Sequence, residues 1–353
     1  MSGTGAAGEF AAPGDFAAQG ELRAMLAGYW RPHAAVYAVR LGVADAMPTD
    51  GSDIAAGEVA GAIGADPVAL NRFLRALSAI GLVRDCGAGR FALTPVGACL
   101  RGDHPQSLKG MALHVGTRLS PAMANLHLCV REGHPPEGVL YGPEGFAELN
   151  QDAAAAAIFN QSMADNSRRI AGEEAAAYDF TRFGTIIDVG GGYGAVLAQL
   201  LKAAPAASGS VLDLDHAREG AERLFAAEGL ADRARFTTGS FFEPFPELAD
   251  AYVLKYILHD WDEDHARRIV AQLGHAARAS NGTVVIIEKV MPERVEPRDD
   301  HAIALQGDMT MMLWNGCERT EAGFADLLAH GGLALTAMIP LADNHFVIEA
   351  RPA

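Results

Sequence analysis

Basic residues are scarce in this sequence of 353 residues. The 28 lysines and arginines are outnumbered by 44 aspartates and glutamates, which gives a formal net charge of −16. Binding to a phosphate backbone depends on clustered Lys and Arg, so this charge argues against a nucleic-acid partner. The same charge suits a soluble enzyme and is compatible with a cationic small ligand.

Closely spaced cysteines and long apolar runs are also missing. No run of about 18 apolar residues exists, so we expect no membrane span. The N-terminal MSGTGAAGEFAAPGDF lacks the basic segment and apolar core of a signal peptide. The cysteines form no CxxC pair, which argues against a zinc knuckle or a disulfide scaffold, and a reducing, cytoplasmic setting is expected. They are Cys86, Cys99, Cys129 and Cys317.

Length and composition predict more than one domain. Half of the residues are hydrophobic, enough for a sizeable core, and the chain is too long for one ordinary domain. We expect a flexible leader at 1–19, a first domain at 20–100, a helical region at 101–178 and a second domain at 179–353. The run Ala153–Ala157 is a strong helix former and supports the helical region.

An apolar stripe opens the first domain. Apolar residues recur every three or four positions from residue 22 to residue 41, which predicts a helix packed in a core or against a second subunit. These residues are Leu22, Leu26, Trp30, Ala34, Tyr37 and Leu41.

A helix-turn-helix pattern with a hairpin follows. Ser52 is in position to cap a short helix, and Asp66-Pro67 is a start signal for a second helix, which Gly81 ends. Residues 82–93 have the pattern of a β-hairpin. Together these elements predict a winged-helix module. Such modules often bind DNA, but the second helix offers only two arginines, so we favour a structural or dimerising role.

Short apolar strands alternate with helices after residue 183. Strands alternating with helices predict an α/β domain with a doubly wound, mostly parallel sheet, in which the antiparallel last strand takes an edge. The predicted strands are 185–190, 210–214, 234–239, 251–258 and 283–290, with a closing hairpin over 333–341 and 344–350.

The segment IIDVGGGYGA, residues 186–195, joins the first of these strands to a helix. Glycines let the backbone turn tightly and approach a ligand at the carboxyl edge of the sheet, where nucleotides bind. Asp213, at the end of the next strand, is placed to accept hydrogen bonds from ribose hydroxyls. The pattern predicts an adenosine-containing cofactor, either NAD or S-adenosylmethionine. Asp188 directly before the glycines, the C-terminal position of the domain, and His259 at the same edge favour the methyl donor.

The segment LKYILHDWDEDH, residues 254–265, raises the question of a metal site. Its spaced aspartates resemble the opening of a calcium loop, but that loop needs Gly and Glu where this chain has His265 and Ala271. Acidic residues in a first turn complement the helix dipole, so we favour a helix start, with a hard-metal site as the alternative.

His259 is predicted to be a general base. It ends a buried strand at the ligand edge, and its ordinary pKa of about 6.5 suits proton transfer at neutral pH. Glu288, at the end of the next strand, and Glu318, before the following helix, can converge on the imidazole and stabilise its protonated form. Glu318 alone could instead cap the helix.

Six motifs in order point to a known family. They are IIDVGGGYGA, VLDLDHA, GSFFEPFP, LKYILHDW, VVIIEKVMP and NGCERTEAGFADLL. With them the chain resembles, over residues 20–351, the S-adenosylmethionine-dependent O-methyltransferases of the plant caffeate / acetylserotonin type, especially bacterial members from natural-product pathways. The resemblance implies an N-terminal winged-helix dimerisation domain, a C-terminal Rossmann-like methyltransferase domain, a homodimer, S-adenosylmethionine as cofactor and no metal.

The resemblance also assigns residues, motif by motif. It implies that His259 is the base, with Glu288 and Glu318 as flanking acids. The chain departs from the family at two places, since Ser240 stands where Asp is frequent and Tyr256 where Trp is frequent. The expected cofactor contacts are Phe146, Met163, Asp188, Gly190, Gly192, Asp213, Ser240, Phe241 and Lys255, and the expected acceptor-pocket residues are Phe159, Tyr256, Asp260, Met311 and Asn315.

A phenol or enol is the acceptor that His259 activates most easily. A phenol has a pKa of about 10, against about 6.5 for histidine, so full prior ionisation would cost about 5 kcal/mol. Transfer is therefore expected to be concerted with methylation, or the phenol is acidified by neighbouring groups. Glu288 and Glu318 narrow the gap by raising the basicity of His259. The alternatives are N- or C-methylation, a repurposed enzyme that binds S-adenosylmethionine without simple O-methylation, a NAD-dependent oxidoreductase and a DNA-binding regulator.

Overall fold

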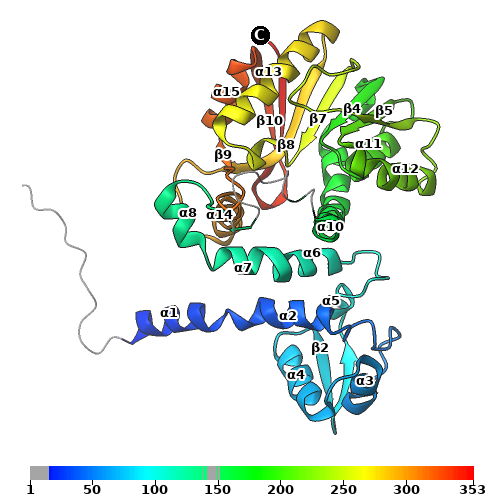
Figure 1. Cartoon of the computed structure of the whole chain (residues 1–353), viewed down its shortest axis with the longest axis vertical. Coiled ribbons are helices and arrows are strands. Elements are labelled where there is room, and N and C mark those ends of the chain that lie inside the picture. Colours follow the sequence, from blue (N-terminus) through cyan, green and yellow to red (C-terminus); the bar gives the residue numbers. More distant parts are fainter. Residues whose placement is uncertain (1–15, 138, 141–148, 150–151) are drawn as a thin grey trace, which may run out of the picture. The chain divides into compact units, whose positions relative to one another are not determined.

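The computed structural model describes residues 16–137, 139–140, 149 and 152–353, in two compact units that divide after residue 104 (Figure 1). Most of the expected helical region therefore belongs to the second unit. Within the described ranges no helix has the length and apolar character needed to cross a bilayer.

The first unit combines helices with a three-stranded sheet. The Asp66 carboxylate accepts a hydrogen bond from Ala69 N and caps α4, and Gly81 just beyond that helix has a φ of +78°, as predicted. β2 and β3 form the predicted hairpin, and β1 pairs with β3, so the winged-helix arrangement is confirmed. The elements are α1 (Ala17–Ala27), α2 (Trp30–Arg40), β1 (Ile54–Ala55), α3 (Ala56–Ile63), α4 (Pro67–Ala79), β2 (Val83–Gly87), β3 (Arg90–Leu93) and α5 (Pro95–Ala98).

Two details of the first unit differ from the prediction. The apolar stripe is divided between α1 and α2, and no residue of α1 is buried; α1 already begins at Ala17, within the range expected as a leader. The prediction that Ser52 caps a helix is wrong. The next helix begins only at Ala56, and Ser52 Oγ donates instead to Asp50 Oδ1 in a local turn.

The second unit begins with helices that precede the sheet in sequence. The alanine run Ala153–Ala157 forms the start of a long helix, α10, which packs against α6 and α11. The elements before the sheet are α6 (Lys109–His114), a π-helical turn (Val115–Leu119), α7 (Ser120–Met123), α8 (Leu126–Glu132) and α10 (Ala153–Ala177).

The sheet of the second unit has the strand order β6-β5-β4-β7-β8-β11-β10, with β9 beside the end of β8. β4 to β8 are parallel, and β11 is antiparallel to β8 as expected. The last strand does not take the edge, because β10 pairs with its outer side. The strands are β4 (Thr185–Val189), β5 (Ser208–Asp213), β6 (Ala234–Thr238), β7 (Ala251–Lys255), β8 (Thr283–Met291), β9 (Arg319–Thr320), β10 (Leu333–Pro340) and β11 (His345–Pro352).

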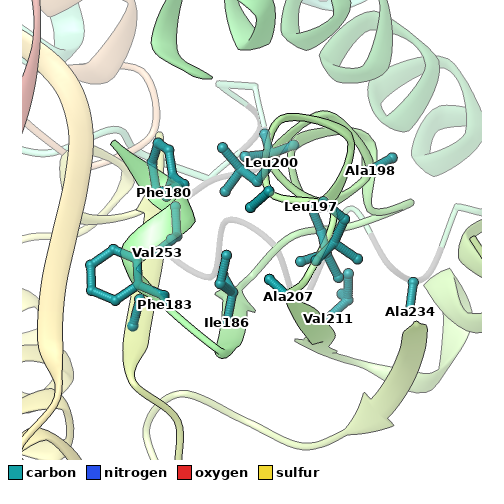
Figure 2. Close-up of a cluster of buried hydrophobic side chains, with 14 of the residues drawn as sticks. Phe180, Phe183, Ile186, Leu197, Ala198, Leu200, Ala207, Val211, Ala234 and Val253 are labelled. Atoms are coloured by element: carbon teal, nitrogen blue, oxygen red, sulfur yellow. The ribbon is translucent and has the colours of Figure 1, made fainter. Parts of the chain in front are cut away.

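Helices cover both faces of this sheet, and each face has its own core. Successive strand residues point to opposite faces, so Ile186 of β4 packs under α11 and α12 while Ile187 packs under α13 and α15. Figure 2 shows the first of these cores, where Phe180 and Leu200 lie over the strands. The covering helices are α11 (Ala195–Ala203), α12 (Arg218–Ala227), α13 (Glu263–Ser280) and α15 (Glu321–His330), and α14 (Asp299–Met311) follows β8.

The contact between α13 and the end of α15 requires a glycine at position 274. A Cβ atom there would lie 1.9 Å from the carbonyl oxygen of Gly331. We expect Gly274→Ala to lower the free energy of unfolding by about 1–3 kcal/mol, because overpacking outweighs the gain in helix propensity. Denaturant unfolding measures the change. Gly323→Ala in α15 is the control, since its Cβ meets nothing closer than 3.4 Å, and equal stability of the two variants would contradict the prediction.

Candidate active site

A cavity of about 580 Å³ lies at the carboxyl ends of the parallel strands. β4 has β5 on one side and β7 on the other, and ligands of open α/β sheets bind at such a reversal of strand order. The loop after β4 and the ends of β5 and β7 line one part of the cavity. Helices α6, α10 and α14, with the π-helical turn after α6, supply an apolar part that includes Met111, Val115, Phe159, Met163 and Met311.

The loop after β4 depends on glycine for its path. Gly190 and Gly192 have φ angles of +71° and +55°, a region that favours glycine. A Cβ on Gly190 would lie 2.5 Å from Ile257 Cδ1, and one on Gly191 would lie 2.3 Å from the Asp188 carboxylate. Around Gly192 the space is open. The backbone of this loop is therefore free to approach a ligand closely.

Asp188 and Asp213 accept backbone hydrogen bonds in and next to this loop. Asp188 is buried, and its Oδ2 accepts a hydrogen bond from Leu197 N in the first turns of α11. Asp213 accepts from Gly192 N (2.7 Å) and from Leu214 N (2.6 Å), and its carboxylate also lines the cavity. Burial raises the pKa of Asp213, and the two amide donors oppose that rise.

The rim beyond β6 carries the predicted adenine contacts. Ser240 Oγ accepts a hydrogen bond from Phe242 N at 3.2 Å, so the serine shapes the turn as well as lining the cavity. The ring of Phe241 meets Trp261 edge to face, with centroids 5.9 Å apart, and forms an apolar wall. A flat adenine ring matches such a wall.

His259 does not end a strand, contrary to the prediction. β7 stops at Lys255, Tyr256 turns the chain with a φ of +55°, and His259 lies in a 3-10 turn over Leu258–Asp260. A left-handed conformation at a tyrosine is uncommon and strained, and strained residues often cluster at functional sites.

Glu288 holds this turn through the backbone. It lies within β8, three residues before the end of that strand, and is completely buried. Its Oε1 accepts hydrogen bonds from the backbone N–H groups of Ile257, Leu258 and His259, at 3.1, 2.7 and 3.4 Å. Glu288 does not line the cavity or bond the imidazole, so it positions the turn that presents His259.

The imidazole of His259 lies between two other acids. Its Nδ1 is 3.0 Å from Glu318 Oε1, and its Nε2 is 3.4 Å from Asp260 Oδ1. The Tyr256 ring stacks on it, with centroids 5.3 Å apart and planes 17° apart. Asp260, which was expected to contact the acceptor, thus lies beside the base and also lines the cavity.

The acids determine the protonation of His259. Burial alone would lower its pKa, but the charges of Asp260 and Glu318, the hydrogen bond to Glu318 and the charge of Glu288 raise the pKa to about 10. Burial raises the pKa of Asp260 to about 7, although the nearby imidazolium opposes this. Burial likewise raises the pKa of Glu288. The sequence prediction that the acids increase the basicity of His259 agrees with this geometry.

Replacing Glu318 with glutamine is expected to lower the pKa of His259, because a charged partner within hydrogen-bond distance is lost. The shift can be followed by NMR titration of 13C-labelled histidine, with the His259 signal assigned by its absence in His259→Gln. Asp264→Asn, at an exposed site early in α13, is the control and should leave the titration unchanged. A His259 midpoint that is the same in Glu318→Gln as in the wild type would show that the acid does not set its charge.

Of the remaining predicted site residues, some line the cavity and others do not. Phe159, Met163, Lys255 and Met311 line the cavity. Asn315 is not among its lining residues, and its Nδ2 donates to Asp262 Oδ2 at 3.4 Å. Phe146 lies outside the described residues.

Several lining residues were not predicted. His114, Tyr193, Gly307, Trp314 and Lys289 all border the cavity. Helical spacing from Met311 could have identified Gly307, four positions before it on α14. No pattern in the sequence singles out His114 or Lys289.

The acidic residues from Asp262 to Asp264 form the start of helix α13. Asp262 caps α13 by accepting a hydrogen bond from His265 N, and Glu263 and Asp264 occupy its first turn, as the preferred interpretation predicted. Among the described residues no group of three or more His, Cys, Asp or Glu is arranged to hold a metal ion.

A glycine loop, an acid at the end of β5 and a buried imidazole line one cavity, an arrangement that suits an enzyme with a nucleotide-like cofactor and a side chain able to take a proton. Family models sharpen this class. Residues 124–334 match the O-methyltransferase domain, and residues 24–103 match the O-methyltransferase dimerisation domain.

Individual relatives agree with the family models. The chain is 33% identical to a phenazine O-methyltransferase of Lysobacter antibioticus, over 94% of this chain and 95% of the relative. It is 36% identical to a 2,7-dihydroxy-5-methyl-1-naphthoate 7-O-methyltransferase of Streptomyces carzinostaticus, over 91% of this chain and 94% of the relative. One solved relative is an O-methyltransferase from neocarzinostatin biosynthesis, crystallised in complex with S-adenosylmethionine and 2-hydroxy-5-methyl naphthoic acid. Its structure superposes on this chain with a TM-score of 0.75 at 34% sequence identity, over 91% of this chain and 96% of the relative. The protein belongs to the O-methyltransferase family, which confirms the resemblance seen in its motifs.

Proposed function

We propose that this enzyme transfers a methyl group from S-adenosylmethionine to a phenolic hydroxyl of a small aromatic natural product, with His259 as general base. The observation that carries the proposal is the buried His259 imidazole, held by Glu318, in the same cavity as the glycine loop. The solved relative with a naphthoic acid and several relatives named for aromatic substrates support an aromatic acceptor.

The residues around the glycine loop suit S-adenosylmethionine. Positive φ angles at Gly190 and Gly192 leave the loop backbone bare, Asp213 offers carboxylate oxygens for ribose hydroxyls, and the Phe241 ring provides a flat apolar wall. The acidic lining also suits a cationic sulfonium. When bound, this cofactor supplies the electrophilic methyl group.

His259 and a phenol hold a proton about equally strongly. A phenol has a pKa of about 10, and the surrounding acids raise the pKa of His259 to about 10. The neutral form of His259 can therefore accept the proton of the acceptor oxygen at little cost, whereas an unperturbed imidazole would leave a gap of about 5 kcal/mol. Because its pKa is about 10, this neutral form becomes populated only as the pH rises toward that value. Glu318 bonds Nδ1, so Nε2, which lies 3.4 Å from Asp260 Oδ1, is the nitrogen that would take the proton of the acceptor.

The dimerisation domain supports a homodimer. Helix α1 has no buried residue, and its apolar side chains Leu22, Met25 and Leu26 are more than half exposed. An exposed apolar patch of this kind favours association. Light scattering during size-exclusion chromatography would report the mass, and a monomer at micromolar concentration would count against the homodimer.

Methyl transfer can be tested with labelled S-adenosylmethionine and a panel of naphthols, hydroxynaphthoates and hydroxyphenazines. We expect a product one methyl group heavier, formed on oxygen, and binding of S-adenosylhomocysteine but not NAD by calorimetry. Failure to bind S-adenosylhomocysteine, or binding without transfer to any phenol of the panel, would overturn the proposal.

A further inference from the structure

The 3-10 turn that presents His259 depends on groups outside itself for its shape. The hydrogen bonds within it are long, at 3.3 and 3.4 Å. Leu258 and His259 are buried, so the other backbone N–H and C=O groups of the turn need partners in the protein. Glu288 accepts from the N–H groups, but a carboxylate cannot serve the carbonyl oxygens.

Arg319 supplies donors to the carbonyl side of this turn. Its Nη1 donates to Leu258 O at 2.9 Å, and its Nη2 donates to Trp261 O at 3.4 Å. Arg319 lies in β9 and is only 6% exposed. A guanidinium holds its donors in a fixed planar fork, so this one side chain reaches a carbonyl at the start of the turn and another just after it.

The segment before Arg319 packs against the same side of the turn. Cys317 N donates to His259 O at 2.9 Å. A Cβ on Gly316 would lie 2.0 Å from His259 O, so only a glycine allows this close approach. The carbonyl side of the turn is therefore covered by this segment, while Glu288 covers the N–H side.

Arg319 also brings a positive charge to a group of buried acids. Burial raises the pKa of Glu288, and the positive charges of protonated His259 and of Arg319 oppose that rise. Arg319 thereby favours the ionised form of Glu288, which is the stronger acceptor for backbone N–H groups. The guanidinium thus supports both sides of the turn, one by hydrogen bonds and the other by its charge.

We propose that Arg319 is a positioning residue for methyl transfer, which holds the turn opposite Glu288 and so keeps the His259 imidazole beside Glu318 and in the cavity. This inference rests on the proposed function, because it assigns Arg319 an effect through the base. Arg319 is not among the residues that line the cavity, so it acts through the backbone of the turn and not by contact with cofactor or acceptor.

Arg319→Lys tests the inference, because it keeps the charge while a single ammonium group cannot reach both carbonyl oxygens. We expect the midpoint of His259 in an NMR titration of 13C-labelled histidine to fall, since the imidazole moves away from Glu318. With a phenol as acceptor, kcat should fall at least about tenfold, as misplacement of a catalytic group would give. The affinity for S-adenosylhomocysteine should be unchanged. Arg267→Lys is the matched control and should change none of these quantities, since Arg267 also pairs with Glu263 but does not bond the turn.

A double variant separates positioning from a purely structural role. In the His259→Ala background, Arg319→Lys should cause no further loss of turnover, because the imidazole through which it acts is gone. A further loss as large as in the wild-type background, or an unchanged His259 midpoint in Arg319→Lys, would overturn the inference. If His259→Ala loses turnover while Arg319→Lys keeps the wild-type kcat, only the assignment of Arg319 is wrong. If no phenol is methylated, the proposed function fails, and the titration still decides whether Arg319 positions the imidazole.

Discussion

Replacing His259 with alanine is expected to reduce kcat for methylation of a phenol by about 10²–10⁴-fold, the usual contribution of a general base. The imidazole lines the cavity with Glu318 on Nδ1 and Asp260 beside Nε2, and its neutral form is a base of about the strength of a phenolate. The affinity for S-adenosylhomocysteine should be unchanged, because the proposed cofactor contacts, Gly192 and Asp213, lie after β4 and at the end of β5 and do not contact His259. Turnover with labelled methyl donor and calorimetry measure the two quantities.

A matched variant separates this effect from general damage. His275→Ala removes an exposed histidine from α13 and should keep wild-type turnover. His259→Gln should be as inactive as the alanine variant, since an amide is not basic. Turnover of His259→Ala within a few fold of the wild type would rule out proton removal by this residue.

Replacing Asp213 with asparagine is expected to weaken S-adenosylhomocysteine binding by about 10- to 100-fold, the value of losing a hydrogen bond to a charged group. Asparagine has nearly the same shape, so the hydrogen bond from Gly192 N can persist through the amide oxygen and the loop can keep its path. The change therefore falls on the contact with the cofactor. Calorimetric titration gives the dissociation constant directly.

Asp215→Asn provides the comparison for this variant. Asp215 is exposed, lies two residues further on and pairs with Arg218 outside the cavity. Its loss should leave cofactor affinity unchanged. If the dissociation constants of the two variants were the same as that of the wild type, the assignment of Asp213 to the ribose would be wrong.

Much of the fold could be predicted because it depends on local patterns. The glycines of the loop after β4 and the alternation of apolar strands with helices depend on backbone geometry alone. Asp66 and Gly81 could also be predicted, because they mark the start and the end of α4 through contacts within a few residues. The prediction that Ser52 caps a helix failed because it was made from the residue type alone. A serine side chain can also hydrogen-bond within a local turn, as Ser52 does with Asp50.

The roles of the acids around His259 could be predicted only in part. Sequence order brings Glu288 and Glu318 to one edge of the sheet, but it does not show where each side chain points. Glu288 binds three backbone N–H groups, Glu318 bonds Nδ1, and Asp260 lies by Nε2. The left-handed turn at Tyr256 produces this arrangement, and no pattern predicts a positive φ at a tyrosine.

Local sequence patterns predicted an α/β enzyme with two parts and a glycine loop that suits an adenosyl cofactor. They could do so because periodicity and glycine spacing act over short stretches of chain. Long-range packing fixed which acid contacts the imidazole, and it brought the Glu288 carboxylate under the turn that carries His259. Those relations join residues far apart in the chain, and their geometry depends on how whole helices pack against the sheet.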